Sequence, residues 1–285
     1  MTAVDESASL AAASVKTPPR RPSRLAGAVR TVLPPIVVFS VVIGVWYLVT
    51  YAFFAPRRRF LLPPPHQVVA EGFLDWARFH EILSALVVSA TVALVGLAIA
   101  SALGMVFAIL MSQASWIERA FYPWAVVLQT IPILAIGPLI GFWFGYGFWS
   151  KTMVCVLIAL FPIITNTLFG LRSVDPGHHD LFTLRRASRW RRLSRLEFPG
   201  ALPAVFTGLR ISAGLSVIGA IVGDFFFRQG EPGIGRLIDD YTRSLDSGPM
   251  FVAVIVSSVF GLAVFWLFGL AAHMIVGPWH ESGRR

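Results

Sequence analysis

Long apolar runs constrain the fold of this chain more than any other feature of its sequence. A helix needs about 20 predominantly apolar residues to cross the hydrocarbon core of a bilayer. Runs of this kind lie at 32–54, 83–111, 121–144, 152–171, 205–227 and 250–276. Charged residues make up 14% of the chain, against about 25% in soluble domains. We therefore expect an all-α integral membrane protein with six transmembrane helices.

The distribution of Lys and Arg predicts the orientation of these helices. Six spans place both ends of the chain on one side of the membrane. Cations gather in residues 1–31, between the fourth and fifth spans and at the C-terminus, and cytoplasmic loops are rich in Lys and Arg. The cations at 57–59 run against this trend. We expect cytoplasmic termini, a disordered basic tail at 1–31, a six-helix domain at 32–278 and a cytoplasmic tail at 279–285.

Several function classes are excluded or disfavoured by the residues present. The net charge of +9 does not indicate nucleic-acid binding, because the cations lie between apolar spans, where membrane lipid is the expected charged partner. Cys155 is the single cysteine, so thiolate metal clusters and intrachain disulfides are excluded. We find no catalytic constellation and no metal motif. The sequence therefore predicts a protein that is not an enzyme.

The chain has no site for nucleotide hydrolysis. A phosphate-binding loop ends in Gly-Lys-Ser/Thr, and neither Lys16 nor Lys151 follows a glycine. If ATP drives this protein, another chain must bind it. Ion coupling usually requires ionisable groups at membrane depth, and the spans hold few, Arg210 and Asp224 among them. A stand-alone ion-coupled secondary transporter or channel remains the alternative.

Polar residues and prolines interrupt the third and fourth spans. Proline removes a backbone donor and bends a helix, and broken helices with polar groups at membrane depth often line a passage. The third span contains Gln129, Thr130 and Pro132, the fourth contains Asn166 near a proline, and Asp224 lies late in the fifth. We expect these five residues to line a translocation pathway, although helix packing alone is also consistent with the interruptions.

The longest basic segment, 176–198, lies between the fourth and fifth spans. Its pattern predicts two short helices with a bend, followed by Pro199 in the first turn of the next helix. Apolar residues at helical spacing, in a loop with nothing else to pack on, favour a partner protein. The alternative is an ordinary basic loop on anionic lipid.

This segment resembles the EAA loop of binding-protein-dependent ABC importer permeases. The family pattern is Glu-Ala-Ala, a glycine four residues after the second alanine, and Ile-x-Leu-Pro ten residues further on. Asp180 stands at the glutamate position, and residues 196–199 match the final element. Leu181 and Phe182 replace the alanines, and Arg186 replaces the glycine that permits the bend.

The resemblance extends over residues 32–278. Short motifs at 62–65, 129–132, 137–138, 143–145 and 233–235 resemble the branch that imports nitrate, taurine, sulfonates, and thiamine or riboflavin precursors. The resemblance implies that the chain is the permease subunit of an ATP-driven importer for a small polar organic molecule or anion. It also implies a multi-pass protein of the bacterial plasma (inner) membrane with the type I fold.

The resemblance also implies partners. These are a second copy of the chain in a homodimer, ABC ATPase subunits that carry ATP and Mg²⁺, and a periplasmic or lipid-anchored substrate-binding protein; no cofactor is expected on this chain. The residues expected to couple to the ATPase are Asp180, Leu184, Arg186, Ala187, Arg189, Trp190, Arg192, Leu196 and Pro199.

Overall fold

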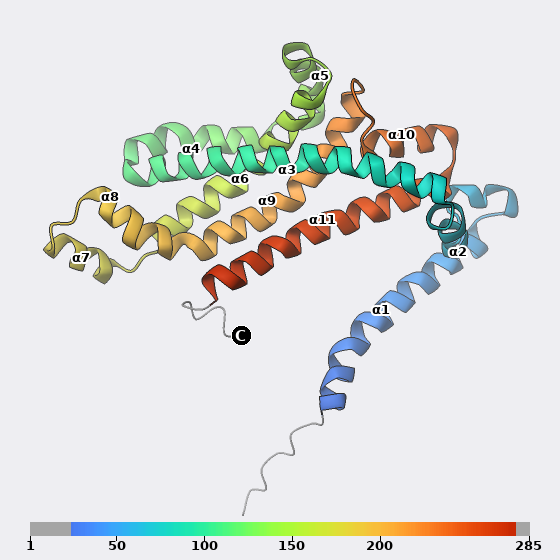
Figure 1. Cartoon of the computed structure of the whole chain (residues 1–285), viewed down its shortest axis with the longest axis horizontal. Coiled ribbons are helices and arrows are strands. Elements are labelled where there is room, and N and C mark those ends of the chain that lie inside the picture. The colour runs from blue at the N-terminus through green and yellow to red at the C-terminus, as the bar shows by residue number, and fades with distance from the viewer. Residues whose placement is uncertain (1–23, 278–285) are drawn as a thin grey trace, which may run out of the picture. The chain divides into compact units, whose positions relative to one another are not determined.

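Every regular element in the described part of the chain, residues 24–277, is a helix (Figure 1). The structure is a computed structural model. The chain divides into two units, residues 1–54 and 55–285, which are described separately. The first contains helix α1 (Arg24–Phe53), which begins earlier than the predicted start at residue 32. The rest of the predicted N-terminal tail and the tail at 279–285 lie outside the described residues.

The second unit alternates long apolar helices with short connecting ones. Its elements, in order, are η1 (Pro56–Leu61), α2 (Pro65–Val68), η2 (Val69–Phe73), α3 (Trp76–Gln113), α4 (Ser115–Thr130), α5 (Ile133–Phe144), α6 (Phe148–Arg172), α7 (Pro176–Leu184), α8 (Arg189–Arg192), η3 (Leu193–Glu197), α9 (Phe198–Phe226), α10 (Ile234–Ser244) and α11 (Ser247–Val276).

Within residues 24–277, five stretches are long and apolar enough to cross a membrane, or six if one bent helix pair forms a single span. The five are α1 from residue 32, α3, α6, the continuous stretch from α8 to α9, and α11. The bent pair is α4 and α5, whose axes differ by 103°. The predicted span at 121–144 is therefore broken near its middle.

Helices α3, α6 and α9 run side by side along the unit and form its centre (Figure 1). Small residues let the backbones approach closely, as is typical of helix packing in membranes. At Gly219 of α9, an added Cβ would lie 2.9 Å from the Cα of Cys155 on α6. Cys155 is fully buried in this contact, together with Val92 and Ala220. The contact fixes α9 against α6, and α9 also contacts η3 at one end and α10 at the other.

A pair of glycine substitutions tests this packing. Gly219→Ala should lower the free energy of unfolding by about 1–3 kcal/mol, because the new methyl group overpacks the contact with α6. Gly214→Ala is the matched control, since nothing lies within 4 Å of a Cβ added at Gly214. Unfolding temperatures in detergent micelles measure the difference. Equal temperatures for the two variants would contradict the close approach of α6 and α9.

Candidate functional site

A buried ion pair joins α6 and α9 at the end of the bundle that lies far from α7 and α8. The Nζ of Lys151 lies 2.7 Å from Oδ1 of Asp224, and the two side chains are 3% and 1% exposed. The Ser89 hydroxyl, on α3, donates a hydrogen bond to Oδ2 of Asp224 at 2.6 Å. An unpaired charge is costly in an apolar interior. Lys151 and Asp224 therefore each need the other to remain charged where they are buried.

The same carboxylate holds the start of helix α10. The amide of Gly235 donates to Oδ2 of Asp224 at 3.2 Å, and the amide of Ile234 donates to the Ser89 hydroxyl at 2.8 Å. A Cβ at Gly233 or Gly235 would collide with the Asp224 side chain. The Gly-x-Gly motif at 233–235 therefore allows the backbone to reach the carboxylate.

Sequence reasoning identified Asp224 but missed Lys151, Ser89 and helix α10. Lys151 stands at the edge of an apolar run, where a cation resembles an ordinary loop residue. The available signal was that Asp224 needed a cationic partner at membrane depth. Lys151 and Arg210 were the candidates in or beside the later spans.

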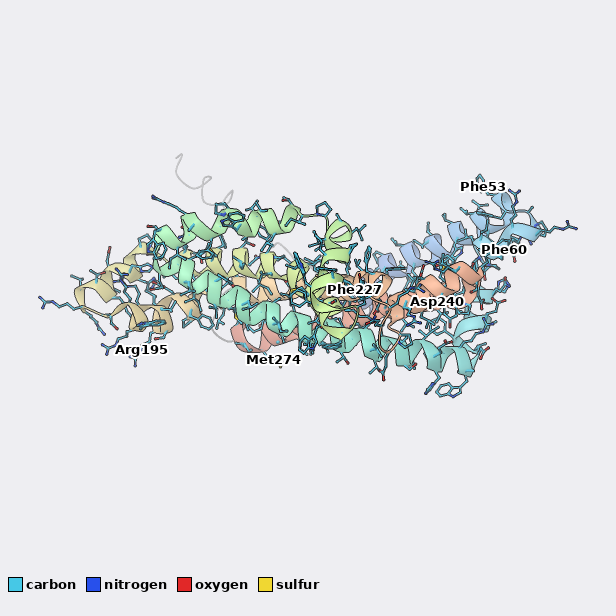
Figure 2. All side chains as sticks on the ribbon, turned by 90° about the horizontal axis from the view of Figure 1, so that it is seen from above. Phe53, Phe60, Arg195, Phe227, Asp240 and Met274 are labelled. Atoms are coloured by element: carbon cyan, nitrogen blue, oxygen red, sulfur yellow. The ribbon has the colours of Figure 1, made fainter. Side chains whose placement is uncertain are left out.

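The outer surface of α10 carries a set of exposed charges. Arg243 donates from Nε to Oδ2 of Asp239 at 2.9 Å, and Arg228 also pairs with Asp239. The hydrogen bond from Arg243 and its charge lower the pKa of Asp239. Burial and the 3.0 Å hydrogen bond that Tyr241 donates to Glu81 raise the pKa of the tyrosine. Figure 2 shows Asp240 of this helix and Arg195, beyond α8, near opposite ends of the unit.

The break between α4 and α5 lies in the predicted polar segment 129–132. The chain leaves helical geometry at Ile131, and Pro132 precedes the first turn of α5. The Thr130 hydroxyl donates to the carbonyl of Val127 at 2.9 Å. The same carbonyl also accepts a 3.1 Å hydrogen bond from the amide of Ile131, so two donors meet at the last turn of α4.

Gln129 lines a cavity of about 210 Å³ between the α4–α5 break, α6 and α9. The cavity wall is mostly apolar and includes Pro162 of α6. Asn166 lies one turn further along α6, and its amide donates to the carbonyl of Pro162 at 2.8 Å. The structure thus brings Gln129 close to the part of α6 that contains Asn166.

Asp224 lies beyond this cavity along α9. Leu215 of α9 lines the cavity, and the 9 residues from Leu215 to Asp224 span about 14 Å of helix at 1.5 Å per residue. The predicted pathway residues therefore fall into two places. One is the region of the α4–α5 break, and the other is the buried ion pair.

Two short helices with a bend form the predicted loop, as the sequence indicated. Asp175 caps α7 by accepting a 2.7 Å hydrogen bond from the amide of Gly177, and Ser188 caps α8. Between the helices, Arg186 has a φ of +46°. This is the left-handed region, which favours glycine. An arginine thus occupies, in a conformation that favours glycine, the position at which the EAA pattern has a glycine.

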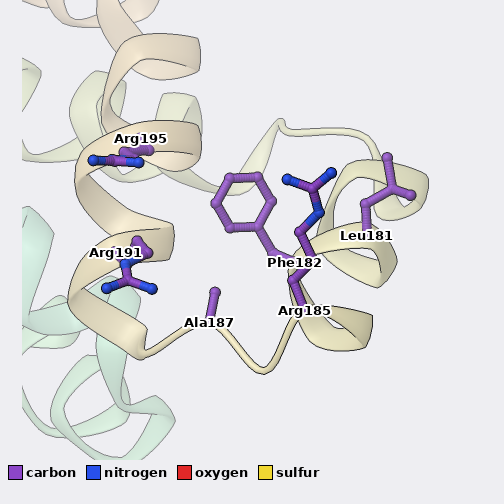
Figure 3. A pocket seen from close by; sticks show the side chains of 6 residues that line it. All are labelled: Leu181, Phe182, Arg185, Ala187, Arg191 and Arg195. Atoms are coloured by element: carbon purple, nitrogen blue, oxygen red, sulfur yellow. The ribbon is translucent and has the colours of Figure 1, made fainter.

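The bend encloses a groove of about 650 Å³ (Figure 3). Leu181, Phe182 and Arg185 line it from α7 and its end, and Arg191 and Arg195 line it from the other side. Leu181 and Phe182 are the residues that replace the family's two alanines. The substitutions therefore change the wall of this groove, which combines apolar side chains with cations.

The predicted coupling residues differ in exposure. Leu184 and Trp190 are 80% and 74% exposed, while Arg192 donates to the Thr183 hydroxyl at 3.0 Å and so braces α8 against α7. The other predicted residues are either exposed, as Asp180, Arg186 and Arg189 are, or half-buried, as Ala187, Leu196 and Pro199 are.

The C-terminal end of the loop is attached to the membrane helices. Gln113, the last residue of α3, donates to the Glu197 carboxylate at 3.2 Å, and η3 runs directly into α9. Leu193 is buried against Leu171 of α6 and Val205 of α9. A displacement of α8 would therefore act directly on α9 and on its neighbours.

The profile of one family, described as "Binding-protein-dependent transport system inner membrane component", matches residues 100–275, which is more than half of the chain. The chain belongs to this family. The permease is 33% identical over 251 residues to the formylaminopyrimidine transport permease protein ThiX of Halalkalibacterium halodurans, covering 88% of this chain and 97% of the relative. It is 36% identical over 167 residues to the riboflavin transport system permease protein RibX of Chloroflexus aurantiacus, covering 59% and 61%.

Relatives named for aliphatic sulfonates, nitrate and taurine also match the permease, over 70%, 90% and 88% of its length. Among solved structures, a chain described as "Crystal structure of an amino acid ABC transporter with histidines" has a TM-score of 0.56 at 16% identity, covering 71% of this chain and 98% of that one. That likeness supports the fold alone. The protein is thus a multi-pass plasma-membrane permease subunit of a bacterial ABC importer.

Removing one partner of the buried ion pair should be more damaging than removing both charges. Lys151→Met should cost about 3–5 kcal/mol of stability, because it leaves the Asp224 carboxylate buried without a cation. Adding Asp224→Asn should recover at least half of this loss. Unfolding temperatures of the single and double variants in detergent give the comparison. If Lys151→Met were as stable as the parent, the pair would contribute nothing to the fold.

Restoring glycine at position 186 should stabilise the loop. Arg186→Gly removes about 1 kcal/mol of left-handed strain, so local opening of the loop should become about fivefold rarer. Hydrogen exchange of the amides in 181–192 measures this change. Arg186→Ala is the control: it removes the same side chain but keeps the strain, and it should leave exchange unchanged or faster.

Proposed function

We propose that this permease is one half of a homodimeric pathway, with six spans of the type I fold and both termini in the cytoplasm. The single observation that carries the coupling role is the two-helix loop α7–α8, which presents exposed Leu184 and Trp190 beside a cation-lined groove. Leu181 and Leu184 lie one turn apart on α7 and are both exposed, and contiguous exposed apolar surface marks an interaction site. On this proposal ABC ATPase subunits bind the loop, and they carry ATP and Mg²⁺.

The opposite end of the unit would face the substrate-binding protein, whether periplasmic or lipid-anchored. Helix α10 lies there with its exposed ion pairs, and the Asp224 carboxylate holds its first turn by accepting a hydrogen bond from the amide of Gly235. We assign Asp224 a positioning role in which it holds this outer helix. Because its carboxylate is already paired with Lys151, a proton relay through Asp224 would have to break that ion pair. This favours the ATP-driven importer over the ion-coupled alternative.

The substrate would pass the break between α4 and α5. Gln129, Thr130, Pro132 and Asn166 are the residues we assign to this pathway. The cavity beside the break is lined mainly by apolar side chains and by Gln129, which suits a small polar organic molecule. The relatives named for formylaminopyrimidine and riboflavin transport support this class of substrate. Those named for sulfonate, nitrate and taurine support small anions as substrates as well.

Charge reversal in the loop tests the proposed coupling. The variant Arg189→Glu/Arg192→Glu should insert normally but fail to couple ATP hydrolysis to transport, since it repels an acidic partner surface and breaks the brace between α7 and α8. The measurement is the ATPase rate of the complex in nanodiscs, with and without the binding protein. We expect the stimulation by the binding protein to fall at least about tenfold.

The matched control is Arg119→Glu, which reverses an exposed cation at the start of α4, outside the loop. It should keep normal stimulation and normal co-purification with the ATPase. Unchanged stimulation in the double variant would refute the docking role of the loop. Loss of stimulation in both proteins would point to a general charge effect and would also count against it.

A further inference from the structure

Two prolines change the main-chain hydrogen bonding at the cavity beside the α4–α5 break. A proline has no amide proton, so it cannot donate to the carbonyl four residues earlier. Pro132 stands four residues after Leu128, and Pro162 stands in the same relation to Ile158. Leu128 of α4 and Ile158 of α6 both line the cavity. Two carbonyls at the cavity wall therefore lack the amide donor that a continuous helix supplies at this spacing.

Neighbouring polar groups do not replace these donors. On α6, the side chains of Thr165 and Asn166 donate to carbonyls that follow Ile158 in the chain. At the end of α4, the amide of Ile131 donates to the carbonyl that precedes Leu128. Within residues 24–277, no hydrogen bond from a side chain or from a loop amide reaches either carbonyl. Both are thus available to a ligand that donates.

The third polar group at the cavity is the carboxamide of Gln129. This side chain is exposed and lines the cavity, and it forms no hydrogen bond with another residue of the described part of the chain. A carboxamide can both donate and accept. Phe161 adds an aromatic ring to the wall, and the other lining side chains are aliphatic. The cavity therefore offers two acceptors, one carboxamide and one ring.

None of the described residues that line the cavity carries a positive charge. The nearest cation on α6 is Lys151, which is paired with Asp224. The cation of α9 is Arg210, which lies over the ring of Phe265 on α11. An anion in the cavity would lose water without gaining a cation, and burying an unpaired charge is costly. The carbonyl lone pairs would also repel it. An uncharged molecule with N–H groups avoids both costs.

The size of the cavity favours a ligand with a single ring. Pockets for drug-sized ligands measure about 300–1,000 Å³, whereas this cavity measures about 210 Å³. A planar ring can pack against Phe161 in the offset or edge-to-face arrangements that aromatic pairs prefer. Its edge then remains free to exchange hydrogen bonds with the polar groups of the wall.

We propose that this cavity selects uncharged single-ring nitrogen heterocycles that carry an amino group, and that it rejects small anions. The amino group donates to the carbonyls of Leu128 and Ile158, and the Gln129 amide donates to a ring nitrogen. This inference rests on the proposed translocation pathway and narrows its substrate class. Of the small organic molecules and anions that the proposed function admits, only the uncharged donors match the cavity wall.

The test compares two ligands that differ only in the donor, 4-aminopyrimidine and 4-methylpyrimidine. The full-length permease in detergent is titrated with each at mildly alkaline pH, where both rings are uncharged, and saturation-transfer NMR measures binding. We expect 4-aminopyrimidine to bind at least about fivefold more tightly, as one additional hydrogen bond predicts. Methanesulfonate, a small anion, should show no saturable binding.

Three variants separate the contributions of the polar groups. Gln129→Leu removes the carboxamide and should weaken binding of both pyrimidines about fivefold. Pro162→Ala supplies an amide donor to the Ile158 carbonyl, so it should weaken binding of 4-aminopyrimidine about fivefold and leave that of 4-methylpyrimidine unchanged. Gln129→Lys provides the missing cation and should create saturable binding of methanesulfonate. The matched control is Gln229→Leu, which removes an exposed glutamine outside the cavity and should change none of these affinities.

Equal binding of the two pyrimidines would overturn the proposal, as would saturable binding of methanesulfonate by the parent or no saturable binding of either pyrimidine. Unchanged affinities in both Gln129→Leu and Pro162→Ala would also overturn it. Should Gln129→Leu not fold, the selective loss in Pro162→Ala decides. The measurement needs neither ATPase nor binding protein. Its failure would therefore leave the coupling role of the loop intact, whereas failed coupling beside normal pyrimidine binding would count against the proposed function alone.

Discussion

The rest of the structure depends on one interaction, the buried ion pair between Lys151 and Asp224. An apolar bundle can pack helices against one another in many registers, because the contacts between small residues are not directional. An ion pair without access to water allows far fewer, since each charge must find the other. The Ser89 hydroxyl and the amide of Gly235 donate hydrogen bonds to the same carboxylate, and the amide of Ile234 donates to the Ser89 hydroxyl. Four helices thereby meet at one group.

This arrangement connects the two ends of the permease through α9. At one end, α9 continues from η3 and the α7–α8 loop, and at the other it carries Asp224, which holds the start of helix α10. The contact of α9 with α6 at Gly219 is too close for independent sliding without local repacking. A force applied at the loop would therefore be transmitted to α10, at the opposite end of α9, by rigid displacement of packed helices, which is a known route for switching transitions.

The α7–α8 loop holds an arginine where the EAA pattern has a glycine. Arg186 adopts a left-handed backbone that glycine would adopt more easily, and the caps provided by Asp175 and Ser188 hold the flanking helices. The two alanine positions have become Leu181 and Phe182, which line the groove. Such changes leave the backbone path intact and alter the surface that a partner would contact.

Much of this protein was determined by its sequence alone. Runs of bilayer length specify membrane helices because no other regular structure, apart from a closed barrel, satisfies its backbone in lipid. The bend between α7 and α8 and the break near Pro132 also follow from local chemistry, since capping residues and proline act within one turn. The loop signature was sufficient to indicate the family.

Only the tertiary structure decided which polar groups meet. Asp224 lies 73 positions after Lys151 and 135 positions after Ser89. No local pattern relates the three residues, and their pairing follows from the register of three packed helices. The same holds for Arg210, whose environment is made by Phe265 and Gly269 of another helix. Helix α10 was missed because its charged face resembles a loop until Asp224 is seen to anchor its start. Sequence specifies what each segment can form, whereas burial and helix register specify which charges become partners.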